Sequence, residues 1–263
     1  MMIISDDAYD KNKPCVLYDN LMAQGVFISS STASGYNVLN AVSGTTWDFW
    51  KPASAGNFAC RVDTGSAHEA DCAFIDAHNI VGDVRVQGST DDVTWVAVTE
   101  TVTVSDGNPI MFIWRGVSYR YWRFEFDCDI APEIGVLMMG KRLVFLQGVD
   151  VSHTSIQHSQ QFELLGGNSL SGQFTGQKII KRSASVEVVF PLLDAAWVDT
   201  TLVDFEYHYN SGQPFAFATM PAKYPKDMGY CQRPEGASEL RPSYYEGGLY
   251  EEFTMALGVY VNG

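Results

Sequence analysis

Apolar and polar residues alternate along much of the chain, which is the pattern of a β-strand with one buried side. Within residues 119–126, Trp122, Phe124 and Phe126 fall on one face, and charged side chains occupy the other. The same alternation recurs in two further segments, residues 184–190 and 253–261. We therefore expect antiparallel sheets that each hide one face.

Turn signals separate these segments and hardly any helical pattern lies between them. Glycine, aspartate and asparagine cluster at three places, residues 88–92, 106–109 and 166–168. Strand following strand favours sandwich or jelly-roll packing over an alternating α/β sheet. The sequence predicts an all-β protein: an N-terminal jelly-roll β-sandwich, followed by a second, mainly β domain with one principal α-helix.

One segment has the period of a helix. Val198, Leu202, Phe205 and Tyr209 are spaced to form a single stripe, with a proline before them and an Asn-Ser-Gly stop after them. This spacing predicts the principal helix over about residues 193–210, packed as a lid on a sheet.

The best domain boundary lies near residue 142. Residues 134–140 form an apolar closing strand, and a Gly/Ser/Gln-rich stretch follows up to residue 177. We therefore predict one domain over residues 1–142 and a β-rich assembly domain over residues 143–263. The polar stretch 147–177 is either a flexible extension or the arms of a long β-hairpin.

Charge and composition exclude several classes of function. The chain has 263 residues, with 17 basic against 31 acidic side chains and a formal net charge of −14. An acidic chain lacks the basic surface that binds nucleic acid or anionic lipid. No apolar run approaches the roughly 20 residues of a membrane helix, and the acidic start differs from a secretion signal. We expect neither nucleic acid binding nor membrane insertion.

The candidate residues for covalent or metal chemistry do not form known constellations. The five cysteines form no Cys-x-x-Cys pair, and we expect them to be reduced, half-buried apolar residues, with one bridge left open. Ser169 lies in a Gly-Asn-Ser-Leu-Ser run that lacks the final glycine of a nucleophile elbow. His153 and His158 face opposite sides of a strand, and the spacing of His68 and His78 matches no zinc pattern. We expect no catalytic residue, metal or cofactor.

The most informative cluster is aromatic. Trp47, Asp48 and Trp50 follow a Gly-Thr-Thr loop and precede Lys-Pro. Burying one aromatic ring gains roughly 4–6 kcal/mol gross, so at least one of the two tryptophans is expected in the core. A tryptophan on a loop beside an aspartate is also suited to stack on a sugar ring and bond its hydroxyls. Both assignments stay open for this cluster.

Several segments together resemble the discoidin, or coagulation factor 5/8 type C, jelly roll. They are Asn-Ala-Val-Ser-Gly at 40–44 with Trp47 and Trp50, the stretch 84–95, the strand 119–126 and the closing Ile-Gly-Val-Leu at 134–137. The resemblance covers about residues 10–142 and implies a galactose-binding-like sandwich. Asp92-Val93 stands where the family usually has Asp-Gly, and the disulfide of extracellular members is not evident.

The layout of the whole chain resembles tail-tip or baseplate proteins of tailed phages. That resemblance implies a non-enzymatic virion protein, assembled in the host cytoplasm and resident in the tail. Its C-terminal domain would form a ring-like homo-oligomer through the stretch 147–177 and the strand 253–261, contacting other tail proteins while the jelly roll is displayed. The alternative is a carbohydrate-binding module that recognises a cell-surface glycan through Trp47, Asp48 and Trp50.

Overall fold

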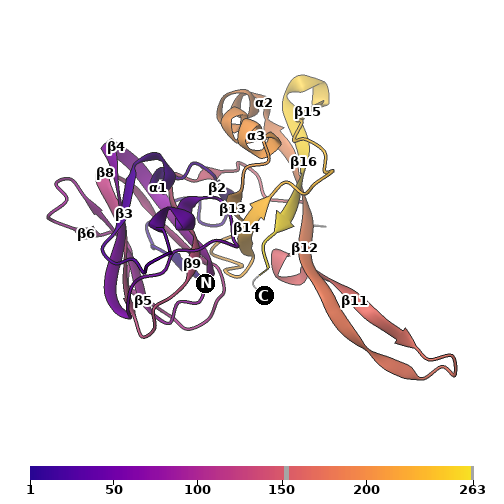
Figure 1. Cartoon of the computed structure of the whole chain (residues 1–263). Coiled ribbons are helices and arrows are strands. Elements are labelled where there is room, and N and C mark those ends of the chain that lie inside the picture. Colours follow the sequence, from indigo (N-terminus) through magenta and orange to yellow (C-terminus); the bar gives the residue numbers. More distant parts are fainter. Residues whose placement is uncertain (151–153, 262–263) are drawn as a thin grey trace. The chain divides into compact units, whose positions relative to one another are not determined.

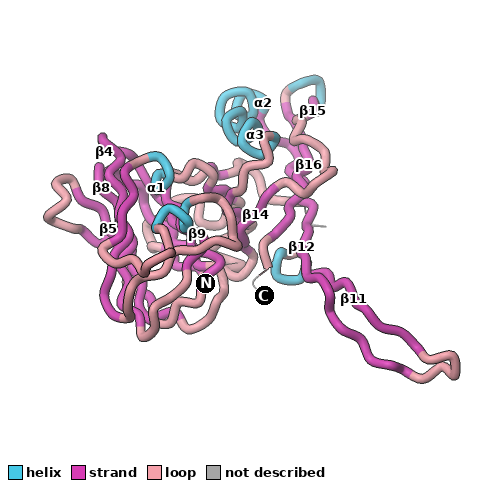
Figure 2. The backbone as a smooth tube through the Cα atoms, viewed as in Figure 1, coloured by secondary structure: helices cyan, strands magenta, loops and turns pink. Residues whose placement is uncertain are grey.

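The computed structural model describes residues 1–150 and 154–261 (Figure 1). Strands make up most of the regular structure in this part of the chain (Figure 2). Most of their pairings are antiparallel, whereas β1 runs parallel to β8. The predicted all-β class is confirmed.

The chain divides into two compact units. Unit 1 comprises residues 1–148 and 213–230, and unit 2 comprises residues 149–212 and 231–263. The sequence placed the boundary near residue 142 and all of 143–263 in one domain, and those limits stay a prediction. Residues 213–230 belong to unit 1 although they follow most of unit 2 in the chain, and no local sequence pattern predicted this.

Unit 1 is a β-sandwich. Its larger sheet has the order β3-β4-β8-β5-β6, with β1 on β8, β9 on β4 and β7 on β5; a smaller set runs β10-β2-β13. The strands are β1 (Met2–Ile4), β2 (Cys15–Leu17), β3 (Val26–Ser29), β4 (Gly56–His78), β5 (Gly82–Ser89), β6 (Val96–Ala97), β7 (Val102–Val104), β8 (Ile110–Cys128), β9 (Ile134–Gly140), β10 (Leu143–Val144) and β13 (Phe215–Ala218), with the short helices α1 (Leu21–Gln24) and η1 (Val38–Val42).

The alternation in the sequence accounts for the core of unit 1. Trp122, Phe124 and Phe126 on β8 are fully buried, as their shared parity predicted. They pack with Trp50 and Phe58, and the Phe58 and Phe126 rings stack at 5.1 Å between centroids. Burial of these rings is the main stabilising contribution to the sandwich.

A buried ion pair lies where β4 meets the segment after β9. The Arg142 Nε donates to Asp71 Oδ2 at 3.1 Å, and the Arg142 backbone N–H donates to Asp71 Oδ1 at 2.8 Å. Both side chains are fully buried. A second guanidinium nitrogen donates to the Tyr9 carbonyl at 2.7 Å. The pair therefore ties the end of the predicted closing strand to the centre of β4.

Unit 2 is built on a three-stranded antiparallel arrangement in which β12 lies between β11 and β16. The strands are β11 (Gln160–Asn168), β12 (Phe174–Asp194), β15 (Ser243–Tyr245) and β16 (Tyr250–Val259), and Cys231 and Gln232 at the end of β14 (Met228–Gln232) also pair with β16. Short helical turns η2 (Ile156–His158) and η4 (Glu246–Gly248) complete the unit. The strands predicted at 184–190 and 253–261 are confirmed, the second ending at residue 259.

The principal helix is confirmed over residues 195–210. It comprises α2 (Ala195–Trp197), a π turn η3 (Val198–Leu202) and α3 (Val203–Asn210). The Asp194 side chain accepts from the Trp197 N–H at 2.9 Å and caps the first turn. All four residues of the predicted apolar stripe are buried, and the Tyr209 hydroxyl donates to the Ala256 carbonyl on β16 at 2.8 Å. The helix packs on a sheet, as expected.

The polar stretch forms the arms of a long β-hairpin. β11 and the first part of β12 run antiparallel from the Gln160–Ala184 pair to the Asn168–Phe174 pair. The turn predicted at 166–168 is wrong, because those residues still belong to β11 and the chain reverses at 169–173. The glycines there accommodate a register shift instead, since a Cβ on Gly166 would lie 2.3 Å from the Gly176 carbonyl oxygen.

All five cysteines are free thiols and buried. Burial raises the pKa of the Cys15 thiol to about 11, so at neutral pH it is protonated and inert. Among the helices within the described ranges, none is long and apolar enough to cross a membrane.

Candidate functional site

The segment between β3 and β4 carries the predicted aromatic cluster, and its C-terminal end is fixed in the core. Trp50 is fully buried and exchanges backbone hydrogen bonds with Ile134, at 3.0 and 2.9 Å. Its indole packs against Phe58 at 5.5 Å between centroids, and its Nε1 donates to the Thr32 hydroxyl at 3.2 Å. Trp50 is therefore a structural anchor of this loop.

The other tryptophan of the cluster faces solvent. Trp47 is 79% exposed, among the highest values of any aromatic residue in the described structure. Asp48 beside it is half-buried. Its Oδ1 accepts from the Asn40 side-chain amide at 2.7 Å and from the Phe49 N–H at 3.0 Å. Those two bonds orient the carboxylate and leave Oδ2 able to accept a further hydrogen bond.

The N-terminal side of the same loop is anchored by a distant part of unit 1. The Tyr230 hydroxyl donates to the Gly44 carbonyl at 3.2 Å. Gly44 has φ +85°, a backbone conformation that favours glycine, and a Cβ there would lie close to Pro214, at 3.3 Å. Trp47 is thus held on a short span between Gly44 and Trp50, each attached to the sandwich.

A second aromatic surface borders this span. The Tyr36 and Phe49 rings stack at 5.3 Å between centroids, and Lys51 places its Nζ 5.8 Å from the Tyr36 centroid. Lys51 also forms an ion pair of 3.1 Å with Glu133. The partly exposed rings of Tyr36 and Phe49 and the charged Lys51 therefore belong to the same unit as the exposed Trp47 indole, and Phe49 and Lys51 are also close to it in sequence.

The structure separates the three predicted site residues by exposure. Trp47 and Asp48 are accessible, whereas Trp50 has no free ring face in this conformation. The expectation that one tryptophan belongs to the core is met by Trp50. The carbohydrate-binding role of the cluster stays a prediction, and it rests on Trp47 and Asp48. Asn40, which orients Asp48, was matched in the sequence only as part of the family pattern.

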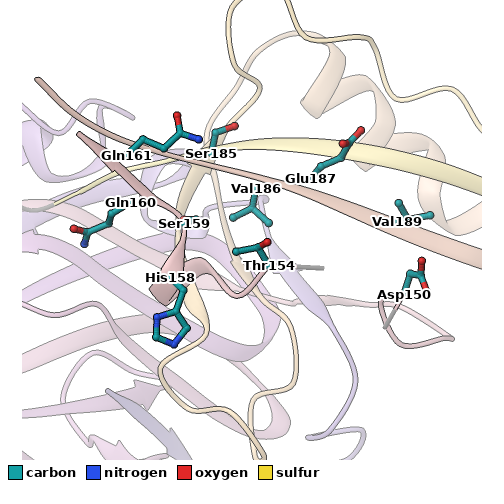
Figure 3. A pocket seen from close by; sticks show the side chains of 10 residues that line it. All are labelled: Asp150, Thr154, His158, Ser159, Gln160, Gln161, Ser185, Val186, Glu187 and Val189. Carbon is teal, nitrogen blue, oxygen red and sulfur yellow. The ribbon is translucent and has the colours of Figure 1, made fainter. Parts of the chain in front are cut away.

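A cavity in unit 2 is lined mostly by polar side chains. It measures about 420 Å³ and lies along β12, η2 and the start of β11. His158, Asp150 and Glu187 line it, yet Figure 3 shows these side chains pointing in different directions. A general acid–base pair needs groups within hydrogen-bond reach of one site. These three side chains do not meet that requirement.

The histidines have local structural partners. His78 is buried, with Nε2 2.9 Å from the Asn108 carbonyl oxygen and Nδ1 accepting from the Ile80 N–H at 3.2 Å. His68 lies 3.1 Å from the Ser66 hydroxyl, and His153 falls outside the described residues. Within the ranges that the structure covers, no three His, Cys, Asp or Glu side chains could hold a metal ion.

Ser169 and the turn acids also serve local structure. The Ser169 hydroxyl lies 2.8 Å from that of Ser171 and accepts from the Gln173 N–H at 3.1 Å, so it stabilises the tip of the hairpin. Asp91 accepts backbone hydrogen bonds from Thr94 and Val93, which lower the pKa of its carboxyl to about 2. It closes the turn after β5 as an ionised cap.

Comparison with known proteins gives structural likenesses without a family. No family model matches the chain, and no curated protein matches it. Chitosan-binding module 2 of a Paenibacillus chitosanase/glucanase, solved with chitotriose, is 16% identical, with 46% of this chain and 99% of that chain covered and a TM-score of 0.42. The module CpGH89CBM32-5 of Clostridium perfringens, solved with GalNAc-β-1,3-galactose, is 10% identical with 46% and 99% covered and a TM-score of 0.41.

A larger enzyme shows a similar likeness over part of its length. A GH29 fucosidase of Ruminococcus gnavus is 16% identical, with 48% of this chain and 27% of that chain covered and a TM-score of 0.43. The fold of this chain is defined by the strand pairings described above, and its candidate site by the geometry of the loop.

Proposed function

We propose that unit 1 is a carbohydrate-binding module and that its ligand is a cell-surface glycan. The observation that carries the proposal is the exposed indole of Trp47, held between the anchors at Gly44 and Trp50. An exposed tryptophan on a constrained span offers apolar area without the loss of loop entropy that a mobile segment would suffer on binding.

The chemistry follows from the two accessible side chains. The Trp47 indole stacks on the apolar face of a pyranose ring, which removes both surfaces from water. Asp48 Oδ2 accepts a hydrogen bond from a ring hydroxyl, and a charged acceptor makes that bond stronger than a neutral one would. Asn40 is a positioning residue, since it bonds to Asp48 Oδ1 and holds the carboxylate in place.

The test is binding of the full chain to a glycan array, followed by calorimetric titration of the best ligand. Trp47→Ala is expected to weaken binding at least about tenfold, since burying a large apolar side chain is worth roughly 1.5–3 kcal/mol. Its unfolding midpoint stays that of the wild type, because the ring is exposed. Val93→Ala, at an 82% exposed apolar position elsewhere on unit 1, is the matched control and binds normally.

Two outcomes contradict the proposal. One is a wild-type chain that binds no glycan on the array, and the other is a Trp47→Ala variant whose affinity is unchanged. Asp48→Asn separates the roles of the two side chains, because it keeps the shape and removes the charge. It is expected to weaken binding less than Trp47→Ala does. Trp50→Ala is uninformative about binding, since it unfolds the core.

A second candidate function is the structural role in a phage tail tip or baseplate. One observation favours it, the long exposed hairpin of unit 2, which is suited to contacts between subunits. In this proposal the chain is assembled in the host cytoplasm and resides in the tail with other tail proteins. Mass spectrometry of purified virions tests it, and absence of the chain from intact particles contradicts it.

A further inference from the structure

The hairpin of unit 2 is a β-structure without a covering layer. We call residues 160–183 the arm. Its two strands project together from the rest of unit 2 (Figure 1). All nine residues of β11 are exposed, and so are the first nine of β12. The arm as a whole carries seven large apolar side chains that are exposed: Phe162, Leu164, Leu165, Leu170, Phe174, Ile179 and Ile180. Exposed apolar residues concentrated on one element mark an interaction site more often than scattered ones do.

One face of the arm continues the core-facing side of its own sheet. On β12, Ala184, Val186 and Val188 are buried in unit 2. Ala184 pairs with Gln160 on β11. Phe162 and Leu164 follow Gln160 at steps of two residues along β11, so their side chains lie on the same face as Ala184. Directly opposed residues share a face. The apolar face therefore extends past the point where the unit's own core ends.

The cross-strand register completes that face. Leu164 lies opposite Ile179, after a register shift next to Glu163. Phe162 lies opposite Arg182. Phe162, Leu164 and Ile179 thus form one apolar patch, which we call the arm face. An isolated two-stranded hairpin is marginally stable in water, so an arm of this length gains stability when a second layer covers the arm face.

The net charge of the arm indicates which kind of surface would cover the arm face. The arm carries one acid, Glu163, and three bases, Lys178, Lys181 and Arg182, so its net charge is +2 in a chain of −14. The rest of the chain therefore holds −16. Complementary charge steers association and opposes wrong partners. A second arm would be repelled, whereas the acidic body of another copy is attractive.

From these observations we propose that the arm of one chain packs on the acidic body of a second copy of the same chain. The arm face becomes buried against that copy, and the three basic side chains lie among its carboxylates. Because the arm and the surface that it contacts differ, two chains can exchange arms in a two-fold dimer, or successive chains can bind head to tail in a ring or a filament. The inference concerns self-association and does not depend on glycan binding by Trp47.

Analytical ultracentrifugation of the full chain over a range of concentrations gives the first test. We expect species heavier than the 29.1 kDa monomer, with a dissociation constant that rises as salt is added. Leu164→Asp and Ile179→Asp are each expected to raise that constant about tenfold to a hundredfold, because each removes one apolar anchor. Both positions are exposed, so the monomer keeps its circular dichroism spectrum and unfolding midpoint.

Matched controls separate the arm from general changes in surface. Val93→Asp introduces the same charge at an exposed apolar position of unit 1 and is expected to leave association unchanged. Lys178→Glu with Lys181→Glu weakens association and its salt dependence, whereas Lys226→Glu does neither. A wild-type chain that stays monomeric overturns the inference. So does association that is insensitive to the arm variants.

Chemical cross-linking identifies directly which molecule contacts the arm. Equal amounts of ¹⁴N- and ¹⁵N-labelled chain are mixed and treated with a zero-length carbodiimide. Pairs that join Lys178 or Lys181 of one isotope to a carboxylate of the other are the expected product. If the arm lysines link only within one isotope species, the arm folds onto its own chain and the proposal is wrong. Glycan titration of the same variants reports on Trp47 separately.

Discussion

β8 in unit 1 and the arm in unit 2 have the same kind of sequence but opposite surroundings. Both place large apolar residues two positions apart on one face of a strand, and both pair antiparallel with a long neighbour. On β8 the apolar rings of Trp122, Phe124 and Phe126 are fully buried, whereas Phe162 and Leu164 on the arm are each 49% exposed. The strand pattern is therefore present in both, and only one has a second layer.

Apolar residues two positions apart therefore specify a strand and its two faces, but not what covers the apolar face. In unit 1 the chain supplies that cover itself, through side chains outside β4 and β8 such as Leu21, Met22 and Trp50. In the arm the apolar face is left for another molecule. Three predictions, in order of decreasing expected effect, test this contrast between covered and uncovered structure.

The largest effect is expected from removing a covered ring. Trp122→Ala deletes a buried indole that contacts Trp114 and Tyr119, so it is expected to lower the free energy of unfolding by about 3–5 kcal/mol. Phe162→Ala on the arm is the matched exposed change, with an expected cost within about 0.5 kcal/mol. Urea unfolding of dilute protein measures both. Equal costs would show that the arm is covered within the monomer.

The second prediction compares a buried ion pair with an exposed one. Asp71→Ala leaves the buried Arg142 guanidinium without its ion-pair partner and is expected to lower the free energy of unfolding by about 3–4 kcal/mol. Glu69→Ala removes a surface pair with Lys141, where the two side chains are 42% and 56% exposed, and is expected to cost less than about 1 kcal/mol. The same unfolding measurement applies. A small effect of Asp71→Ala would mean that water reaches Arg142.

The third prediction concerns pH, through two buried groups of unit 1. Burial raises the pKa of the Asp76 carboxyl to about 7 and lowers that of the His78 imidazole to about 4. Between pH 4 and 6.5 the unfolded chain binds a proton at His78 that the folded chain does not, so falling pH destabilises through His78. Asp76 is protonated only when folded, so falling pH stabilises through it. The two effects oppose each other in the wild type.

The Asp76→Asn variant lacks the opposing carboxyl, so the pH dependence of its stability reports on His78. Its free energy of unfolding is expected to fall by about 3 kcal/mol from pH 6.5 to pH 4, more steeply than that of the wild type. His78→Gln is the matched control, for which the trend has the opposite sign. Chemical unfolding at several pH values measures the slopes. Identical slopes for the two variants would show that these groups titrate alike in the folded and unfolded states.

The elements were largely predictable because their signals are local. In the strand at 119–126, the two-residue spacing of Trp122, Phe124 and Phe126 shows which face is buried. In the helix, the apolar residues from Val198 to Tyr209 recur with the helical period. The turn predicted at 166–168 was wrong, because glycines also permit a register shift within a strand. Local composition does not distinguish these two uses of glycine.

The candidate site was predictable only in part. Trp47, Asp48 and Trp50 stand out as an aromatic cluster on a loop, but their sequence does not say which ring is covered. Burial of Trp50 depends on Ile134 and Phe126, which are distant in the chain. The anchor of Gly44 by Tyr230 joins residues 186 positions apart. No local pattern contains such contacts.

The order of residues along the chain was enough to predict an all-β protein with one helix and the parity of its main strands. These properties depend on neighbours two to four residues away, where the side-chain directions of strands and helices are set. Only the tertiary structure decided that residues 213–230 return to unit 1, that Trp50 is covered while Trp47 is exposed, and that the arm has no second layer. Those outcomes depend on which distant surfaces meet, and that is decided by the packing of the whole chain.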